Sequence, residues 1–422
     1  MDYSMKLAIE GGQKAISLPL PAGGHGVAMM DQEECDAAMR VIKKQQLFRF
    51  LPDAEECKLF EQEAAEWMGV RYALFLTTGT AGLVCALSGL SIGPGDEVIV
   101  PAYTYIATAS ACITVGAVPV ITEVDNSLGL DPIDVEKKIT QYTKAIIAVH
   151  MNGVPCRLRA LQEVAKRHQI PMIEDCCQCV GGSYFGNKAG STSLVSAWSL
   201  NHFKAITCGE GGVMFTNDTS IFERALFQSD PAMPMWGTGR TEWSSLPFSR
   251  ECYRGNEITA AIARVQLKKL PTLLEHMRNL KRTLIQHLSK NPRLYTPQHV
   301  DDPEGDMGLS FALIVNDKAI YSKFSEALSA EGLAAADVYS NTLPDRHIYA
   351  YWDSILNQYG ATSAGYPWKY PCYKGNVTYS RDMCRNSLSV LSRTIRVPLH
   401  YRMTAEHAKQ IAEAINKVDA GL

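Results

Sequence analysis

Short apolar runs alternate with helical patterns through the first half of the chain. Runs of this kind, too short for helices, are typical of strands that are buried on both faces. They are residues 72–78 (YALFLTT), 97–102 (EVIVPA), 118–125 (VPVITEVD), 145–151 (AIIAVHM), 171–175 (PMIED), 194–200 (LVSAWSL) and 212–217 (GVMFTN). Between them, residues 81–90 and 159–168 have helical spacing. The alternation predicts an α/β protein with a mainly parallel, seven-stranded sheet covered by helices on both faces.

Longer patterns flank this alternating region. Residues 33–69 have the apolar spacing of a helix, and a second long helix is expected over residues 256–290. Residues 230–250, before that helix, are rich in Pro, Gly, Ser and Trp. A loop this long is usually functional or mobile. Its residues Trp236 and Trp243 make it a candidate lid over a ligand site, with an ordinary surface loop as the alternative.

A smaller α/β pattern follows the long helix. It consists of a strand at 311–316, a helix at 321–332 and a final helix at 404–417. A chain of 422 residues is too long for one simple core, so two domains are expected. We predict a large domain over residues 1–270 and a small C-terminal α/β domain over residues 271–422.

Charge and composition exclude several classes of protein. The 41 basic and 44 acidic side chains give a net charge of −3, so we expect neither nucleic acid nor an anionic membrane as a partner. No apolar run approaches the ~20 residues that span a bilayer. Residues 1–21 lack the pattern of a signal peptide. Twelve cysteines without a secretion signal indicate free thiols, and we expect the cytoplasm.

Gly79 and Thr80 lie where the first strand gives way to a helix. The strand is expected to end near Thr78 and the helix to begin near Ala81. A helix N-terminus presents unpaired N–H groups and the positive end of the helix dipole, which suit a phosphate group. A threonine N-cap, with glycines that shape the turn, explains the same residues without a ligand.

Asp175 ends an expected strand, in the motif PMIEDCCQC. In parallel sheets ligands bind beyond this end of the strands, and a carboxylate there can keep a pyridinium nitrogen protonated. A helix cap or an ordinary surface acid is the alternative. Cys176 and Cys179 form a CxxC motif, but the chain has no second one. We therefore expect no metal site and small, half-buried cysteines.

Lys204 lies in the turn SLNHFKAITCGEGGV, five residues after Ser199. A lone lysine is ordinarily a solvated surface charge. A lysine that holds an aldehyde cofactor as a Schiff base must first lose its proton, which a crevice near other cations favours. The presence of Asp175 in the same sequence favours the interpretation of Lys204 as a lysine that holds a cofactor.

Together these motifs resemble the DegT/DnrJ/EryC1/StrS family, pyridoxal-phosphate-dependent sugar aminotransferases of fold type I. The resemblance covers nearly the whole chain, and several motifs in the same order are more specific than any one of them. They are LAIEGGQKAI, LTTGTAG, GPGDEVIVPAYTYIATA, GAVPVITEVD, HMNGVP, IEDCCQCVGG, WSLNHFKAITCGEGGV, YRGNEITAA and LSRTIRVPLH.

The resemblance implies a role for each matched residue. Lys204 matches the Schiff-base lysine, and Asp175 matches the partner of the pyridine nitrogen. Gln178 resembles a glutamine near the ring hydroxyl, and Tyr105 matches an aromatic residue that stacks on the cofactor. The positions that bind the phosphate correspond to Gly79, Thr80 and Ser199.

Two positions depart from the family's pattern. Cys252 replaces an asparagine that reaches the phosphate of the neighbouring subunit, and a thiol is a weak donor. We expect Asn256, two residues after Arg254, to take over this contact. Val180 stands where many members have a histidine, which changes the pocket wall beside the cofactor.

The resemblance also implies a homodimer with active sites at the subunit interface. L-Glutamate or L-glutamine would donate the amino group, and a pyridoxamine intermediate would pass it to a keto-sugar, sugar-acid or cyclitol carbonyl. Lys204 would act as base and then acid, and Asp175 would stabilise the carbanionic intermediate. Residues 301–311 (DDPEGDMGLSF) are similar to the branch that aminates C8 of a 3,8-dideoxy-octulosonate, a sugar acid of bacterial lipopolysaccharide, as are the following VYSNTLPDRHIYAYWDSI and the later LSRTIRV. Nucleotide-hexose and cyclitol acceptors stay open.

Three other functions remain as alternatives. Dehydratases of the same family carry histidine in place of the lysine; His202 lies nearby, but the spacing from Ser199 puts Lys204 at that position. A non-catalytic regulator that binds the cofactor would not need Lys204, Asp175 and Gln178 together. A cysteine desulfurase would need a reactive cysteine on a mobile loop.

Overall fold

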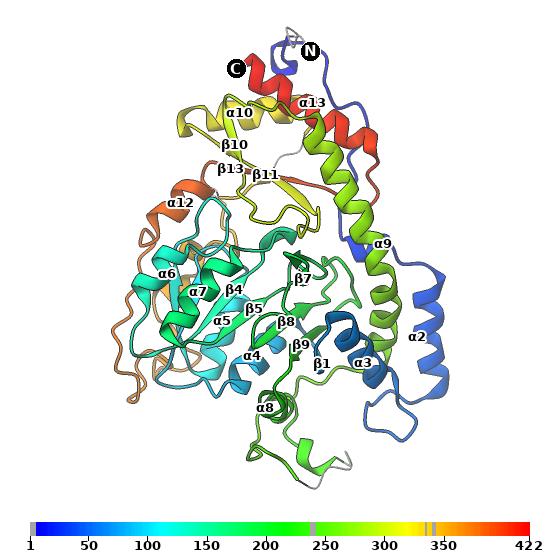
Figure 1. The fold of residues 1–422 in the computed structure, drawn as a ribbon, viewed down its shortest axis with the longest axis vertical. Coiled ribbons are helices and arrows are strands. Elements are labelled where there is room, and N and C mark those ends of the chain that lie inside the picture. Colours follow the sequence, from blue (N-terminus) through cyan, green and yellow to red (C-terminus); the bar gives the residue numbers. More distant parts are fainter. Residues whose placement is uncertain (1–5, 237–241, 334–335, 340–342) are drawn as a thin grey trace.

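The computed structural model of the chain describes residues 6–236, 242–333, 336–339 and 343–422. A seven-stranded sheet forms the lower body of the molecule in Figure 1, and a four-stranded sheet lies above it. The long helix α9 (Glu257–His287) runs down one side, from the four-stranded sheet to the helices beside the large sheet.

The large sheet has the strand order β1-β9-β8-β5-β4-β2-β3. Its strands are β1 (Tyr72–Leu76), β2 (Glu97–Pro101), β3 (Val118–Thr122), β4 (Thr143–Val149), β5 (Met172–Asp175), β8 (Val195–Ser199) and β9 (Gly212–Thr216). Only β9 is antiparallel to its neighbours β1 and β8. Each predicted run forms one strand, which confirms the mainly parallel α/β sheet.

Helices cover both faces of this sheet. Along β4, Ala145 and Ile147 pack into one layer, whereas Ile146 and Ala148 pack into the other, because successive side chains point to opposite faces. The first layer contains α4 (Gly79–Gly89), α5 (Ala107–Val115) and α8 (Thr219–Ser229). The second contains α6 (Pro132–Lys138), α7 (Leu158–His168), α3 (Glu56–Met68) and part of α9. Burial on both faces explains the uninterrupted apolar runs.

The second sheet is antiparallel throughout, in the order β10-β11-β13-β12. Its strands are β10 (Tyr295–Pro297), β11 (Ser310–Val315), β12 (Ala336–Asp337) and β13 (Thr394–Pro398). It is accompanied by α10 (Lys318–Ala330) and α13 (Ala405–Gly421), which form where helices were predicted. The predicted domain boundary at residue 270 falls inside α9, and the division into 1–270 and 271–422 stays a prediction.

The helix predicted over residues 33–69 is wrong as one element. The structure has α2 (Gln32–Lys44) and α3, with residues 45–55 between them. Gln45 adopts φ +58°, the left-handed conformation that closes a helix, and this conformation is usually signalled by glycine. The remaining short elements are η1 (Ala8–Glu10), α1 (His25–Ala28), η2 (Met151–Gly153), β6 (Ser183–Tyr184), β7 (Asn187–Lys188), η3 (Met233–Met235), η4 (Tyr349–Tyr351), α11 (Asp353–Leu356) and α12 (Arg385–Leu391).

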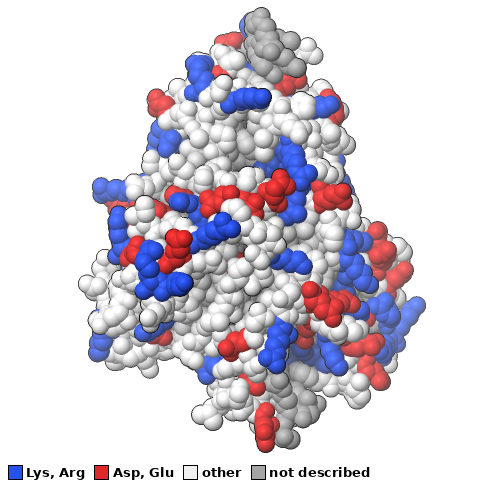
Figure 2. All heavy atoms as spheres, in the orientation of Figure 1, with Lys and Arg blue, Asp and Glu red and all other residues white. Residues whose placement is uncertain are grey.

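The surface mixes both signs of charge. On the face drawn in Figure 2, basic and acidic side chains are interspersed, in keeping with the near balance of charges along the chain. Within the described ranges, none of the helices combines the length and apolar character needed to cross a membrane.

Candidate active site

A cavity of about 530 Å³ opens at the carboxyl ends of the parallel strands, and we call it the first lobe. A second lobe of about 430 Å³ adjoins it and shares Cys177, Gln178 and Lys204 with it. The predicted site residues that line the first lobe are Gly79, Thr80, Tyr105, Asp175, Gln178, Ser199 and Lys204. Asn256 does not line either lobe, so the fold brings seven of the eight predicted residues together.

The N-terminus of α4 forms one wall of the first lobe. Thr78 Oγ1 accepts a hydrogen bond from Ala81 N at 3.0 Å, so Thr78 is the N-cap and the helix begins at Gly79, earlier than predicted. The N–H groups of Gly79 and Thr80 therefore have no partner within the helix. A Cβ on Gly79 would lie 2.7 Å from Cys177 Sγ and 2.8 Å from Ser199 Cβ. Glycine thus lets Ser199 approach a cradle of N–H donors that suits a phosphate group.

Asp175 is the last residue of β5, and only 4% of its surface is exposed. Its carboxylate oxygens accept hydrogen bonds from Thr108 Oγ1 at 2.9 Å and from Cys177 N at 3.0 Å. Thr108 Oγ1 in turn lies 2.8 Å from Thr104 Oγ1. The carboxylate is therefore held by neutral donors, and its charge remains available to a cationic group of a ligand.

Lys204 lies in the turn after β8, and its backbone is fixed on both sides. Its N–H donates to Asn201 O at 2.9 Å, and its carbonyl accepts from Gly26 N at 3.2 Å. The side chain lines both lobes, and Nζ makes no hydrogen bond or ion pair with any residue that the structure describes. A positioned but unpaired amine next to a cavity suits a nucleophile or a proton carrier.

Two further predicted residues bring in partners that the sequence did not reveal. Gln178 Oε1 accepts from Asn152 N at 3.2 Å, and Asn152 Nδ2 donates to Tyr103 OH at 3.1 Å. Asn152 adopts φ +54°, a conformation that local sequence patterns did not indicate. The Tyr105 ring is 43% exposed and lies 5.5 Å from the ring of His347, which also lines the cavity.

His347 is held by an acidic neighbour. Its Nδ1 lies 2.7 Å from Asp345 Oδ1. Burial opposes ionisation of this carboxyl, but the bonds from His347 outweigh burial and hold the pKa of Asp345 below its usual value. The stretch VYSNTLPDRHIYAYWDSI contains both residues, but its resemblance to the octulosonate branch gave neither of them a role.

The residues around Arg254 lie away from both lobes. Asn256 is exposed and caps α9, with Oδ1 accepting from Thr259 N at 3.1 Å. Arg254 pairs with Asp230 at 2.7 Å, and Cys252 is exposed. A contact from this region to the cofactor of a neighbouring subunit stays a prediction.

The candidate lid lies partly outside the described residues, which omit 237–241. Trp236 stacks on Phe50, with ring centroids 5.4 Å apart, and Trp243 lies 5.0 Å from the ring of Phe227. Neither tryptophan lines a lobe of the cavity. A role as substrate lid stays a prediction.

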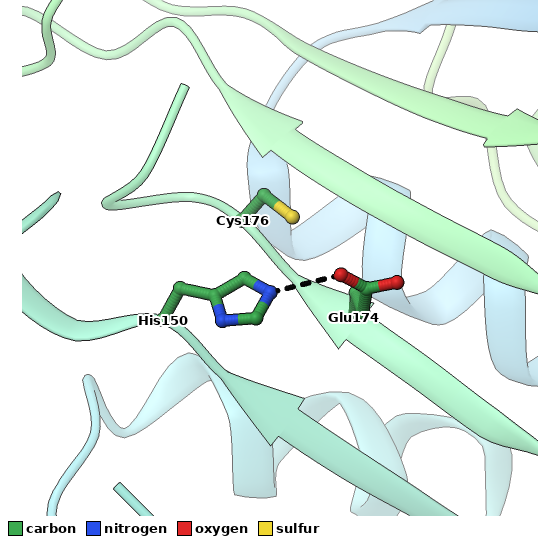
Figure 3. A group of neighbouring side chains, drawn as sticks. All are labelled: His150, Glu174 and Cys176. Carbon is green, nitrogen blue, oxygen red and sulfur yellow. Dashed lines mark hydrogen bonds and ion pairs between the residues drawn. The ribbon is translucent and has the colours of Figure 1, made fainter. Parts of the chain in front are cut away.

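Figure 3 shows a group formed by His150, Glu174 and Cys176, all of which are fully buried. Their side-chain atoms lie within 4.8 Å of one another, as in a metal site. However, Glu174 already accepts from His150 Nε2 at 3.0 Å and from Gly190 N at 2.7 Å, and His150 Nδ1 accepts from Cys156 N at 3.1 Å. The group therefore fastens the loop after β7 to β5.

The cysteines are more deeply buried than predicted. Cys176 and Cys179 are both fully buried rather than half-buried. Burial raises the pKa of Cys176 to about 12, so its thiol stays protonated at neutral pH. The CxxC motif is thus part of the core beneath the cavity.

A larger cavity, of about 710 Å³, lies between the C-terminal part of α9 and β10–β11. It contains none of the predicted site residues. Two of its basic side chains are already engaged, since Lys281 pairs with Asp306 and Arg282 pairs with Glu304. We therefore take the two lobes around Lys204 as the active site.

A seven-stranded sheet that carries a helix N-terminus, a buried acid and a lysine at one edge defines the fold type I class of transferases. An aminotransferase from Psychrobacter cryohalolentis has the same fold, with a TM-score of 0.78 and 24% identity over 95% of this chain and 99% of that one. The chain belongs to the DegT/DnrJ/EryC1/StrS aminotransferase family, whose family model matches residues 28–358. This confirms the family expected from the motifs.

Curated relatives of known activity align with much of the chain. GDP-perosamine synthase from Caulobacter vibrioides is 37% identical over 236 residues, which are 56% of this chain and 62% of that protein. L-Glutamine:2-deoxy-scyllo-inosose aminotransferase from Streptomyces kanamyceticus is 31% identical over 361 residues, 80% of this chain and 81% of that protein. The chain spans 59% to 62% of the length of the first relatives that it matches.

Proposed function

We propose that the protein is a pyridoxal-phosphate-dependent aminotransferase that moves an amino group from L-glutamate or L-glutamine to a sugar-like carbonyl compound. One observation carries the proposal: the unpaired amine of Lys204 and the buried carboxylate of Asp175 line the same lobe as the free N–H groups of α4. The family membership supports the same reaction.

The residues present fit this cofactor. The N–H groups of Gly79 and Thr80, with the Ser199 hydroxyl, would hold its phosphate. Asp175 would hold the ring nitrogen in its protonated form, and Lys204 would hold the aldehyde carbon. When bound, the cofactor supplies an electron sink for the bond that breaks at the α carbon of the amino donor.

The protein's own side chains would then carry out two tasks. Lys204 Nζ would remove the α proton of the donor and return a proton, because it is the amine without a protein partner at the junction of the two lobes. Asp175 would present its carboxylate to the ring nitrogen, since Thr108 and Cys177 N donate to its oxygens and fix their position.

Two relatives support a sugar-like acceptor. One is a GDP-perosamine synthase, and the other is an L-glutamine:2-deoxy-scyllo-inosose aminotransferase. We propose a keto-sugar, sugar-acid or cyclitol acceptor, in sugar, polysaccharide or natural-product biosynthesis. The octulosonate of lipopolysaccharide remains a candidate, because Leu309 and Ser310 of its motif line the second lobe.

We also propose that the enzyme is a cytoplasmic homodimer. The exposed Cys252 and Asn256 lie outside the chain's own cavity, as expected for residues that face a second subunit. All twelve cysteines are free, which suits a reducing compartment.

The test is the absorbance of the purified protein reconstituted with pyridoxal phosphate, before and after addition of L-glutamate. We expect a visible band that moves into the near ultraviolet, and neither the band nor its movement in Lys204→Ala. Lys166→Ala, which removes an exposed lysine on α7, is the matched control. A wild-type protein that does not take up the cofactor, or that responds to neither glutamate nor glutamine, would contradict the proposal.

A further inference from the structure

We infer that the second lobe binds a carboxylate of the substrate and that Arg396 recognises it. The inference rests on the proposed function, because it assigns a substrate group to the same active site. The second lobe lies between the N-terminal segment, β13 and the turn that carries Lys204.

The second lobe is lined by basic groups. Arg396 contributes a fixed positive charge, Lys204 contributes an amine, and His25, His347 and His400 contribute imidazoles. None of its described lining residues is Asp or Glu. A hollow lined by one sign of charge attracts a ligand of the opposite sign.

Arg396 has no partner within the described part of the chain. It is half-buried on β13, opposite Ala312 of β11, and its guanidinium makes no hydrogen bond or ion pair there. By contrast, Arg157 pairs with Asp125, and Arg264 pairs with Glu56. A guanidinium presents two parallel N–H donors that match a carboxylate. An anionic ligand would therefore complete the half-buried Arg396.

A second group in the lobe is also left without a partner. His25 is 9% exposed, and its Nδ1 is buried without a hydrogen-bond partner among the described residues. Its ring stacks on that of His400, with centroids 5.5 Å apart. Buried polar atoms are rarely left unpaired in native proteins unless a ligand or water completes them. His25 and His400 therefore form one wall of the second lobe, and the case for a carboxylate rests on Arg396.

The second lobe is connected to the reacting centre. Gln178 and Lys204 line both lobes, and Asn152 bonds Gln178 Oε1 while it lines the second lobe. A substrate anchored at Arg396 can therefore extend to Lys204 Nζ, and such positioning lowers the entropy cost of the reaction. Once Lys204 has bound the cofactor, Arg396 is the fixed positive charge that remains among the described residues that line the second lobe.

Two substrates of the proposed reaction can bring the carboxylate. The amino donor always carries an α-carboxylate, and the acceptor carries one if it is a sugar acid. The donor half-reaction and the binding of a sugar acid separate these two sources.

The experiment compares Arg396→Met with Arg396→Lys and with Arg402→Met, which removes an exposed arginine near His400. If the donor brings the carboxylate, Arg396→Met raises the L-glutamate concentration for half-maximal spectral change by about 10–100-fold. Arg396→Lys has a smaller effect, and Arg402→Met has none. If the acceptor brings it, the glutamate response is unchanged, but calorimetry shows weaker binding of D-glucuronate, while binding of neutral D-glucose is unaffected.

The inference is overturned if Arg396→Met changes neither the glutamate response nor glucuronate binding by more than about twofold. Thermal unfolding of each variant shows whether the fold is kept, and Arg396→Lys tests the site if the methionine variant fails to fold. Calorimetry with glutarate, which has no amino group, separates failure of the carboxylate site from failure of the proposed function. Glutarate binding that depends on Arg396, with no spectral response to glutamate in the wild type, would contradict the transamination and keep the carboxylate site.

Discussion

The two lobes of the active site differ in how their polar groups are held. In the first lobe, Asp175 is bonded to Thr108 and Cys177 N, and Ser199 Oγ accepts from Asn201 N at 3.3 Å. In the second lobe, Arg396 and His25 Nδ1 have no partner among the described residues. Asp175 and Ser199 are thus fixed before any ligand binds, whereas the Arg396 guanidinium is paired only when a ligand enters the second lobe.

This difference predicts two kinds of mutational effect. Loss of a fastened group in the first lobe should slow the reaction with every amino donor and acceptor. Loss of an unpaired group in the second lobe should affect only ligands that carry the matching charge. The following predictions test this distinction, from the largest expected effect to the smallest.

The largest effect is expected from Asp175→Asn. An amide has a similar shape but no negative charge, so it no longer stabilises a protonated ring nitrogen. We expect the rate of the glutamate half-reaction at saturation to fall about 10³-fold. Stopped-flow absorbance measures it. Thr108→Val, which removes one donor but keeps the carboxylate, should cost no more than about tenfold. An asparagine variant within tenfold of the wild type would show that the charge of Asp175 is not used.

Gly79→Ala tests the cradle at the start of α4. The new Cβ would lie 2.7 Å from Cys177 Sγ and 2.8 Å from Ser199 Cβ, so the wall of the first lobe must shift. We expect the Kd for pyridoxal phosphate to rise about 10–100-fold, measured by fluorescence titration.

Two companion variants make this result specific. Gly93→Ala is the control, because its new Cβ would have its nearest neighbour at 3.5 Å. Adding Cys177→Ala to Gly79→Ala should recover part of the affinity, since it removes one of the two contacts. Unchanged cofactor affinity in Gly79→Ala would separate this turn from phosphate binding.

The sequence predicted the first lobe better than the second, for a physical reason. Buried parallel strands read as continuous apolar runs, and their carboxyl ends meet at one edge, so Asp175 and Lys204 were expected there. The resemblance to the family added Ser199 to them. Asn152 depends on a positive φ, and Arg396 lies on a strand of the other sheet. Such residues enter the site only through tertiary contacts.

The same limit explains the wrong helix boundary. Apolar residues also occur between the two helices, in QQLFRFLPDAE (45–55), and Gln45 closes α2 in the left-handed conformation without a glycine. Helix propensity and the periodicity of apolar residues reflect local conformational preference. The break between α2 and α3 depends instead on how the chain turns back onto the core. The Thr78 cap, by contrast, was close to its expected position because threonine is a strong local signal.

His25, which lines the second lobe, is expected to make the stability of the fold depend on pH. Burial, together with the nearby His400, lowers the pKa of His25 to about 4, from about 6.5 in the unfolded chain. Between these values the unfolded state binds the proton more readily, so stability falls as the pH is lowered. The loss should reach about 2–3 kcal/mol at the acid end of this range.

Urea denaturation of the wild type and His25→Gln at several pH values measures this contribution. The variant should lose less stability than the wild type between about pH 7 and about pH 4.5, because glutamine does not titrate. Carboxylates titrate in both proteins and cancel in the comparison. Parallel curves for the two proteins would show that His25 accepts a proton in the folded state, as a solvated histidine would.

The smallest effect is expected at Asn256, which belongs to neither lobe of its own chain. Its side chain caps α9 through Thr259 N, so Asn256→Ala should cost about 1 kcal/mol of stability. Asn256→Ser keeps a capping oxygen but removes the amide.

If the side chain only caps α9, the serine variant keeps both stability and cofactor affinity. If it also reaches the phosphate of a neighbouring subunit, the serine variant keeps stability but binds pyridoxal phosphate more weakly, and the loss disappears when the protein is diluted to monomers. Cofactor titration at two protein concentrations, with analytical ultracentrifugation of the same samples, therefore separates a local cap from a contact across the subunit interface.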